Sequence, residues 1–241
     1  MIVFSDTMLR SQTNLSNNAV NRNQSLNAVL PPLSWELTFG GSFLTNTLLS
    51  KNEPFANPNN LSGAFYSYYD IVILKNKVQN LSLRPGLGCN IQTFGLNKII
   101  QNNSNNSEFV DFGSNQNYKY SYLQQIFIDM PLGVVYNFLP RNKKKQCEFT
   151  IGAIIGYMIY KEKKYVLKNS SVMDNDIKNL NSFRYGLFGK VSTGKKRFGL
   201  SYSLSGQYYL NDLFLSKNNT PTRNFSIMFG ISFSLNMDSK K

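Results

Sequence analysis

The sequence predicts an all-β protein, an eight-stranded antiparallel up-and-down transmembrane β-barrel, and three observations lead to this fold class. Apolar and polar residues alternate along several segments of the 241-residue chain, and a strand sends successive side chains to opposite faces. The clearest such segment, residues 223–236, is long enough to cross a bilayer at a tilt, which takes roughly 9–11 residues. Long and short connections alternate between the segments, as they do in outer-membrane barrels.

Eight segments are expected to form the wall of the barrel. In chain order they are residues 33–48, 63–74, 81–100, 118–139, 146–160, 181–191, 197–210 and 223–236. In the first segment Trp35 and Leu37 share one face, and Glu36 and Thr38 share the other. Pro131 lies inside the fourth segment, where it is expected to mark a bulge or an edge irregularity, because proline has no N–H to donate to a neighbouring strand.

The connections predict how the chain is oriented. Outer-membrane barrels have short periplasmic turns and longer extracellular loops. An even number of strands with this alternation places both termini on the periplasmic side of a bacterial outer membrane. We expect residues 33–236 to form the barrel, residues 1–32 a flexible polar N-terminal arm, and residues 237–241 a short polar tail.

The direction of the two faces separates this fold from a soluble alternative. A barrel of the lipocalin type, which carries a ligand inside, would turn the apolar face inward. In this chain the polar face is rich in Gly and Ser, which suits a narrow filled lumen, and the apolar face is rich in Phe, Tyr, Leu and Ile, which suits lipid contact. We therefore expect the apolar face to contact outer-membrane lipid.

Composition narrows the function. The formal net charge is +13, but the basic residues form short clusters between apolar segments and no continuous stripe, so nucleic acid is not an expected partner. The chain has no His, and its two Cys residues are far apart and lack the spacing of a zinc site. From these absences we expect no metal site, no cofactor and no enzymatic activity.

Four charged residues are expected inside the barrel when the apolar face points outward. They are Glu36, Arg84, Glu148 and Arg184. Charges buried in a narrow lumen should pair, because an unpaired buried ion is strongly unfavourable. A path for protons or solutes is the alternative for the same residues.

Two basic turns form a second group of candidate residues. The first contains Arg141, Lys143, Lys144 and Lys145, and the second contains Lys195, Lys196 and Arg197. Such turns attract anionic lipid headgroups, or they dock an acidic periplasmic partner by charge.

Several aromatic residues are candidates for the membrane interface. We expect a number of them to belong to aromatic girdles, the alternative being a platform for a sugar or another ligand. The set is Trp35, Tyr66, Tyr68, Tyr157, Tyr160 and Tyr208.

A family resemblance rests on four segments that occur in order. Residues 122–138, YLQQIFIDMPLGVVYNF, resemble the Y-L-x-I-P-L-x-x-K-Y strand of PorT-like outer-membrane β-barrel proteins of Bacteroidota. Residues 83–88, 150–157 and 202–213 resemble the family's x-Q-P-E-L-x-Y, T-A-G-P-Y-x-G-Y and A-R-Y-x-x-G-L segments. The resemblance implies an eight-stranded barrel in the outer membrane.

The same resemblance implies an accessory or structural subunit of a cell-envelope assembly, related to type IX secretion or gliding, with proteins of that complex as partners. The alternative is a stand-alone surface barrel that binds an external ligand through its long loops. A soluble lipocalin-like carrier is the third possibility.

Overall fold

The structure is a computed structural model that describes residues 33–44, 60–75, 80–96, 98–102, 107–111, 118–138, 146–167, 171–195, 200–213, 215 and 222–235. The expected polar arm and polar tail lie outside these residues. The strands are β1 Leu33–Leu44, β2 Leu61–Tyr69, β3 Ile71–Lys75, β4 Asn80–Leu96, β5 Lys98–Asn102, β6 Ser107–Asp111, β7 Tyr118–Asn137, β8 Gln146–Leu167, β9 Ser171–Asp174, β10 Phe183–Lys195, β11 Leu200–Tyr209 and β12 Asn224–Leu235. Among the described residues no helix has the length and apolarity needed to cross a membrane.

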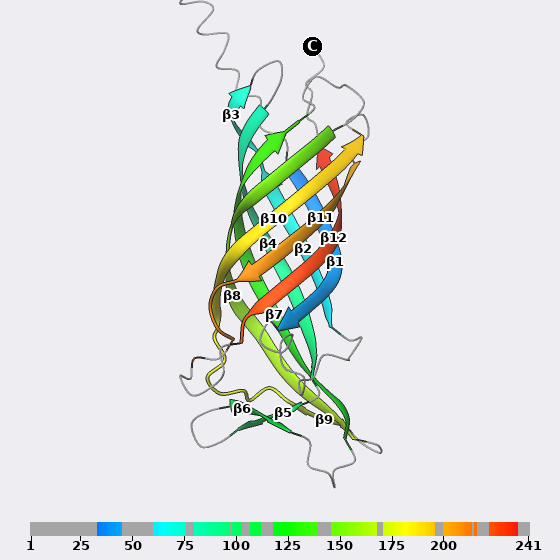
Figure 1. Cartoon of the computed structure of the whole chain (residues 1–241), viewed down its shortest axis with the longest axis vertical. Helices are drawn as coiled ribbons and strands as arrows, with labels where there is room; N and C mark the ends of the chain where they lie inside the picture. Colours follow the sequence, from blue (N-terminus) through cyan, green and yellow to red (C-terminus); the bar gives the residue numbers. More distant parts are fainter. Residues whose placement is uncertain are drawn as a thin grey trace, which may run out of the picture. The chain divides into compact units, whose positions relative to one another are not determined.

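Eight of the strands close into one antiparallel barrel (Figure 1). Around the wall the order is β1, β2, β4, β7, β8, β10, β11 and β12, so each strand pairs with the next long strand in the sequence. The barrel closes where β12 pairs with β1, from Leu33 opposite Leu235 to Leu44 opposite Asn224. The predicted eight-stranded up-and-down barrel is confirmed.

The wall is apolar outside and polar inside. In β12, Phe229 and Phe233 are 68% and 55% exposed, whereas Ser226 and Met228 are fully buried. In β1, Leu37 and Phe39 point outward, and Glu36 and Thr38 are buried. Exposed large apolar residues occur on all eight wall strands. A protein surrounded by water would expose the polar face instead, so the lipocalin alternative is excluded and the barrel spans a lipid bilayer.

The two ends of the barrel differ in their connections. At the short-turn end, where β1 begins and β12 ends, the connections between wall strands cover residues 70–79, which include the short strand β3, and residues 138–145 and 196–199. At the long-loop end they cover residues 45–60, 97–117, 168–182 and 210–223. The β5–β6 hairpin and β9, which pairs with the last residues of β8, belong to this second end (Figure 1).

Several boundaries differ from the predicted ones. The expected second strand is divided into β2 and β3 at Asp70, whose carboxylate binds the Arg84 guanidinium. The expected loop at residues 101–117 contains β6, and the expected loop at residues 161–180 begins with seven more residues of β8, up to Leu167. These elements were missed because their sequences, SEFVD and KEKKYVL, lack the alternation of apolar and polar residues that reveals a membrane strand.

Pro131 does not mark a bulge. The pairing of β7 with β4 has the same register at Pro85–Leu132 and at Gly88–Asp129. Between these pairs Gly86 and Leu87 of β4 are skipped, so Pro131 occupies a position at which β4 does not require its N–H. Two register shifts along β7 lie elsewhere, between Tyr118 and Tyr120 and between Ile126 and Phe127, both against β8.

An apolar cluster lies inside the barrel towards the long-loop end. It is formed by Leu44, Phe94, Leu96, Ile100, Leu123, Phe127, Met158, Ile177, Leu180 and Leu213. Three residues of this cluster come from the connections after β9 and β11, namely Ile177, Leu180 and Leu213. These connections therefore contribute side chains that cover the lumen from this end.

Two tyrosines assigned to the aromatic girdles lie elsewhere. Tyr66 and Tyr68 are 2% and 6% exposed and belong to a buried cluster inside the barrel. The alternation of β2 explains this, since Phe65 and Tyr69 take the outward positions. Tyr157 and Tyr160, in contrast, are exposed on the outer wall.

Candidate functional site in the barrel lumen

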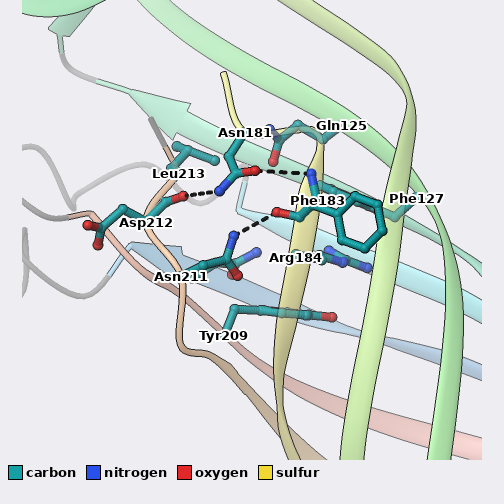
Figure 2. Close-up of a pocket in the computed structure, with 10 residues that line it drawn as sticks. Gln125, Phe127, Asn181, Phe183, Arg184, Tyr209, Asn211, Asp212 and Leu213 are labelled. Atoms are coloured by element: carbon teal, nitrogen blue, oxygen red, sulfur yellow. Dashed lines mark hydrogen bonds between the residues drawn. The ribbon is translucent and has the colours of Figure 1, made fainter. Parts of the chain in front are cut away.

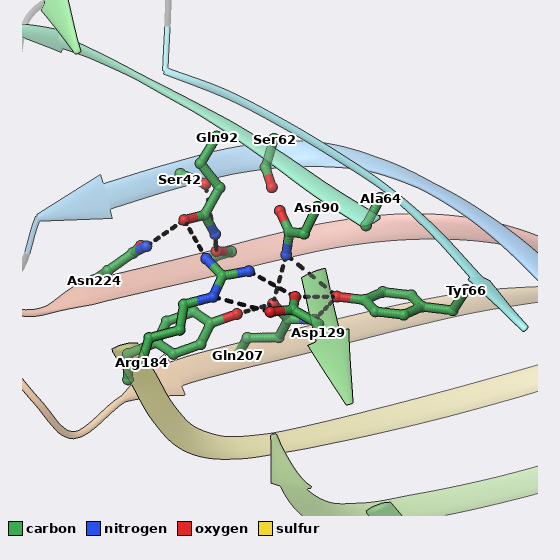
Figure 3. A network of polar contacts seen from close by, with 12 residues as sticks. Ser42, Ser62, Ala64, Tyr66, Asn90, Gln92, Asp129, Arg184, Gln207 and Asn224 are labelled. Atoms are coloured by element: carbon green, nitrogen blue, oxygen red, sulfur yellow. Dashed lines mark hydrogen bonds and ion pairs between the residues drawn. The ribbon is translucent and has the colours of Figure 1, made fainter. Parts of the chain in front are cut away.

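An ion pair between β10 and β7 lies inside the barrel (Figure 3). Arg184 Nη2 donates to Asp129 Oδ2 at 2.6 Å, and Arg184 Nε donates to Asp129 Oδ1 at 3.1 Å. The third nitrogen, Nη1, donates to Gln92 Oε1 of β4 at 2.8 Å. The fork geometry suits a carboxylate, and both residues are buried.

Aromatic rings cover the two faces of the same guanidinium. The Arg184 Cζ atom lies 3.6 Å from the centre of the Phe127 ring and 4.3 Å from that of Tyr209. A desolvated cation gains from the negative faces of such rings. The charge of Arg184 is therefore stabilised by a carboxylate in its plane and by rings on its faces.

The Tyr66 hydroxyl joins this ion pair to the opposite wall. It donates to Asp129 Oδ2 at 2.9 Å and accepts from Asn90 Nδ2 at 3.2 Å and Gln207 Nε2 at 3.3 Å. These residues belong to β2, β7, β4 and β11, so side chains from strands that are not neighbours in the wall meet across the interior (Figure 3).

Two further clusters of ion pairs lie nearer the short-turn end. Lys190 Nζ of β10 donates to Glu36 Oε2 of β1 at 2.8 Å, and Ser203 Oγ donates to Glu36 Oε1 at 2.5 Å. Arg84 of β4 pairs with Glu148 of β8 at 3.1 Å and with Asp70 at 2.5 Å. The three clusters together fill the lumen with compensated charges.

The four charged residues singled out in the sequence all lie inside the barrel. Arg84 and Glu148 form an ion pair with each other, whereas Glu36 and Arg184 pair with residues that the sequence analysis did not single out. The missed partners are Asp70, Asp129 and Lys190. Asp129 lies two residues from the buried Phe127, and Lys190 lies two residues from the buried Phe188. Because an apolar residue shares the inward face in each case, the sequence did not reveal that this face is the polar one.

The basic turns lie outside the described residues, except that the backbone of Lys195 ends β10. The structure does not describe the other six residues proposed for docking, which are Arg141, Lys143, Lys144, Lys145, Lys196 and Arg197. The thiols of Cys89 and Cys147 are free and half-buried. Cys89 precedes the inward-facing Asn90, and Cys147 precedes the inward-facing Glu148.

A pocket opens towards the long-loop end, next to the Arg184 ion pair (Figure 2). The space inside it that water-sized groups can occupy is about 20 Å³. The lining residues are Gln125, Phe127, Asn181, Phe183, Arg184, Tyr209, Asn211, Asp212, Leu213 and Asn224. The rim is fixed by side-chain amides: Asn211 Nδ2 donates to the Phe183 carbonyl at 2.7 Å, and Asn181 Nδ2 donates to the Asp212 carbonyl at 3.2 Å.

Arg223 stands beside this rim, in the connection that leads to β12. Its Nη1 donates to the Tyr208 hydroxyl at 3.2 Å, and its Nε lies 3.7 Å from Asp212 Oδ1. The hydrogen bond to Tyr208 and the nearby carboxylate raise the pKa of the Arg223 guanidinium above its usual value. Arg223 and Asp212 are both 44% exposed, so the attraction between them is screened by water.

Replacing Arg84 with alanine is expected to destabilise the barrel. The change leaves Asp70 and Glu148 without the cation that bridges them, and Glu148 is 7% exposed. Removing one partner of a buried pair typically costs about 3–5 kcal/mol, and the partial exposure of Asp70 should keep the loss near the lower end of that range. Thermal unfolding of the purified barrel in detergent measures the effect, and an unchanged unfolding temperature would show that the pairing does not contribute.

The chemistry of the lumen is that of a packed interior. In the described part of the chain, no group of three or more His, Cys, Asp or Glu side chains is arranged to hold a metal ion. A closed eight-stranded wall, an apolar exterior and a polar interior filled from all sides define a transmembrane β-barrel of the small outer-membrane type.

Comparison with known proteins finds similar solved structures but no matching family. No protein-family model matches the chain, and no curated protein sequence does. Solved structures with a similar arrangement include the outer membrane enzyme PagL, with a TM-score of 0.48 and 9% identity over 84% of this chain and 99% of PagL. They also include Ail of Yersinia pestis, with a TM-score of 0.33 and 9% identity over 85% of this chain and 99% of Ail. The outer membrane protease OmpT of Escherichia coli has a TM-score of 0.34 and 11% identity, over 85% of this chain and 94% of OmpT.

The expectation that the chain is not an enzyme is wrong as it was drawn. The solved structures above include an outer membrane enzyme and an outer membrane protease. The lack of histidine in this chain leaves catalysis by other side chains open.

Proposed function

We propose that this chain is an integral barrel of a bacterial outer membrane that serves as an accessory or structural subunit of a cell-envelope assembly, with both termini in the periplasm. The observation that carries the proposal is the filled lumen. Ion pairs and hydrogen bonds connect opposite walls, and an apolar cluster lies between them and the long-loop end. A barrel filled in this way acts through its ends and its outer wall rather than as a general channel.

The family resemblance supports the finer part of the proposal. The segments at residues 83–88, 122–138, 150–157 and 202–213 resemble those of PorT-like barrels of Bacteroidota, which points to an assembly related to type IX secretion or gliding. The short-turn end would face the periplasm, where the basic turns at residues 141–145 and 195–197 would meet an acidic partner.

The experiment that tests this function is extraction of the barrel from membranes in a mild detergent, followed by electrophoresis with and without boiling. A closed barrel is expected to migrate differently before and after boiling, and partner proteins are expected to co-purify in fixed proportion. Neutralising the seven basic residues of the two turns should release those partners and leave the heat-dependent shift unchanged.

Two results would contradict the proposal in different ways. A barrel that shifts on boiling but purifies without partners would not be a subunit of a stable assembly. Stepwise conductance of the purified barrel in a planar bilayer would contradict the filled lumen. As a control, the Arg84→Ala variant changes a lumen residue and leaves the turns unaltered, so it should retain any partner that binds the turns.

A second function is favoured by the shape of the long-loop end. β7 and β8 continue past the last residues that β8 pairs with β10, and β9 pairs with the extension of β8. This extension carries three lysines, Lys161, Lys163 and Lys164. The Nζ atom of Lys164 lies 5.8 Å from the centre of the Tyr122 ring. A stand-alone surface barrel that binds an external ligand here would purify alone and would lose binding when the extension is shortened.

A further inference from the structure

The short strand β3, Ile71–Lys75, has one edge that no other described strand covers. Within the described residues it pairs with β4 alone, on its other side. β1 covers the corresponding edge of β2 as far as the pair of Leu33 and Tyr69, which lies before β3 begins. The wall therefore has an open strand edge at the short-turn end, at the top of the barrel in Figure 1.

The side chains of β3 are apolar and exposed on both faces. Ile71, Val72, Ile73 and Leu74 are between 44% and 60% exposed. The wall strands alternate exposed and buried residues, and no other described strand exposes four large apolar residues in a row. Ile73 lies at a register shift between Val72 and Leu74, an irregularity that is common at the edges of sheets. β3 thus combines an open edge with a continuous apolar surface.

An extended peptide segment is the neighbour that suits both the edge and the side chains. In antiparallel pairing about half of the backbone N–H and C=O groups of a strand point to each side, so β3 directs part of its own away from β4. Lipid tails would cover the apolar side chains, but hydrocarbon does not tolerate unbonded N–H and C=O groups. Water bonds these groups but leaves the side chains exposed. An added strand with apolar residues pairs with the edge and covers the side chains.

A second copy of this chain cannot supply the strand. Two barrels inserted the same way form a closed pair about an axis along the membrane normal. Strands of such barrels tilt by roughly 35–45°, so the two β3 strands would cross at about 70–90° and could not form a ladder. The residues directly before β1 are also unsuited, because Pro31 and Pro32 have no N–H to donate. The strand is therefore expected from another protein.

The place of β3 in the fold agrees with a partner that carries acidic groups. β3 pairs with the first residues of β4, and β4 in turn pairs with the end of β7, where Asn80 lies opposite Asn137. The first basic turn, at residues 141–145, follows β7 in the sequence. A strand bound to β3 and an acidic group bound to this turn can therefore belong to the same partner.

We propose that β3 is the docking strand for a periplasmic protein, and that an extended segment of this protein, with apolar residues at alternate positions and acidic residues at its ends, adds to the open edge. Backbone hydrogen bonds hold the segment, and the exposed side chains of β3 contact its apolar residues. This inference rests on the proposed function, which supplies the partner and the periplasmic side, and adds the way in which the partner binds.

The test is fluorescence anisotropy of the labelled peptide EVTVTVE with the purified full-length barrel in nanodiscs. The peptide has strand-forming residues between acidic ends. The control peptide has the same sequence with N-methyl groups on its valines and threonines, so it keeps the side chains and loses the N–H groups of a ladder. We expect EVTVTVE to bind and the control peptide to bind at least tenfold more weakly. Absence of binding, or equal binding of the two peptides, would overturn the proposal.

Two variants connect the binding to β3. Ile73→Lys puts a charge on the edge strand, which is how natural proteins prevent pairing at an edge. It is expected to weaken binding of EVTVTVE at least tenfold. Leu215→Lys is the matched control, because Leu215 is exposed to a similar degree and lies at the long-loop end.

Folding of each variant is checked by its heat-dependent shift on a gel, which separates loss of binding from loss of structure. If Leu215→Lys weakens binding as much as Ile73→Lys, or if Ile73→Lys has no effect, β3 is not the site. If Ile73→Lys does not fold, the comparison of the two peptides decides, because it uses the unmodified barrel.

Co-purification with Ile73→Lys separates this inference from the proposed function. Partners that are lost from this variant support both, whereas partners that stay bound to it leave the assembly role standing and overturn docking through β3. If no partner co-purifies with the unmodified barrel but EVTVTVE binds as expected, the assembly role alone fails. If EVTVTVE binds only to a barrel that lacks residues 1–31, the chain itself covers the edge and the docking proposal is overturned.

Discussion

Arg184→Met is expected to destabilise the barrel by about 3–5 kcal/mol, the loss that follows when one member of a buried ion pair is removed. The substitution leaves Asp129 fully buried and deprives it of two charge-assisted hydrogen bonds. It also removes the guanidinium from between the Phe127 and Tyr209 rings. Denaturant unfolding of the folded barrel, followed by the change in gel migration, measures the loss.

The double variant Arg184→Met with Asp129→Asn is the control for this prediction. It removes the uncompensated charge and retains an amide that can still accept from the Tyr66 hydroxyl. We expect it to recover a large part of the lost stability, because a neutral side chain is far less unfavourable in the lumen than a lone carboxylate. A single variant as stable as the unmodified barrel would mean that the ion pair contributes nothing.

Gly186→Ala is expected to destabilise the barrel by about 1–3 kcal/mol, as overpacking of a rigid interior does. A Cβ atom on Gly186 would lie 2.3 Å from the Tyr208 carbonyl oxygen and 2.9 Å from the Tyr209 Cα atom. Both are backbone atoms of the neighbouring strand β11, so they cannot move aside as a flexible side chain would. Relief requires separation of β10 from β11, which the unfolding temperature in detergent would report.

Gly189→Ala in the same strand is the matched control. No atom lies within 4 Å of the position that its Cβ would take. Alanine also has less conformational freedom to lose than glycine, so this variant should be neutral or slightly more stable. Equal losses for the two variants would indicate that the close approach at Gly186 is unimportant.

The wall of the barrel could be predicted because the membrane imposes a simple pattern on it. In β12 every outward position is apolar and the inward positions are small, polar or occupied by Met228, so the strand was recognised with nearly its observed bounds. The alternation of β1 placed Glu36 inside for the same reason. Lipid contact acts on each strand separately, and therefore leaves its mark in a local stretch of sequence.

The interior could be predicted less well, because its contacts join residues distant in the sequence. Glu36 and Lys190 are 154 positions apart, and no local pattern pairs them. Tyr66 and Tyr68 were assigned to the membrane interface because tyrosine is common there, whereas the register of β2 turns them inward. β6 and the extension of β8 were missed because their sequences lack the alternation of apolar and polar residues.

The seam between β1 and β12 has a consequence for how the chain becomes a barrel. The first and last wall strands hold each other along their whole length, so the hydrogen bonds that remove the last two edges depend on β12, which is synthesised after the other wall strands. Until then β1 and β11 would each expose unpaired N–H and C=O groups, which hydrocarbon does not tolerate. Insertion into the bilayer and closure of the barrel are therefore coupled events. A chain that lacks β12 has no smaller closed barrel as a stable intermediate.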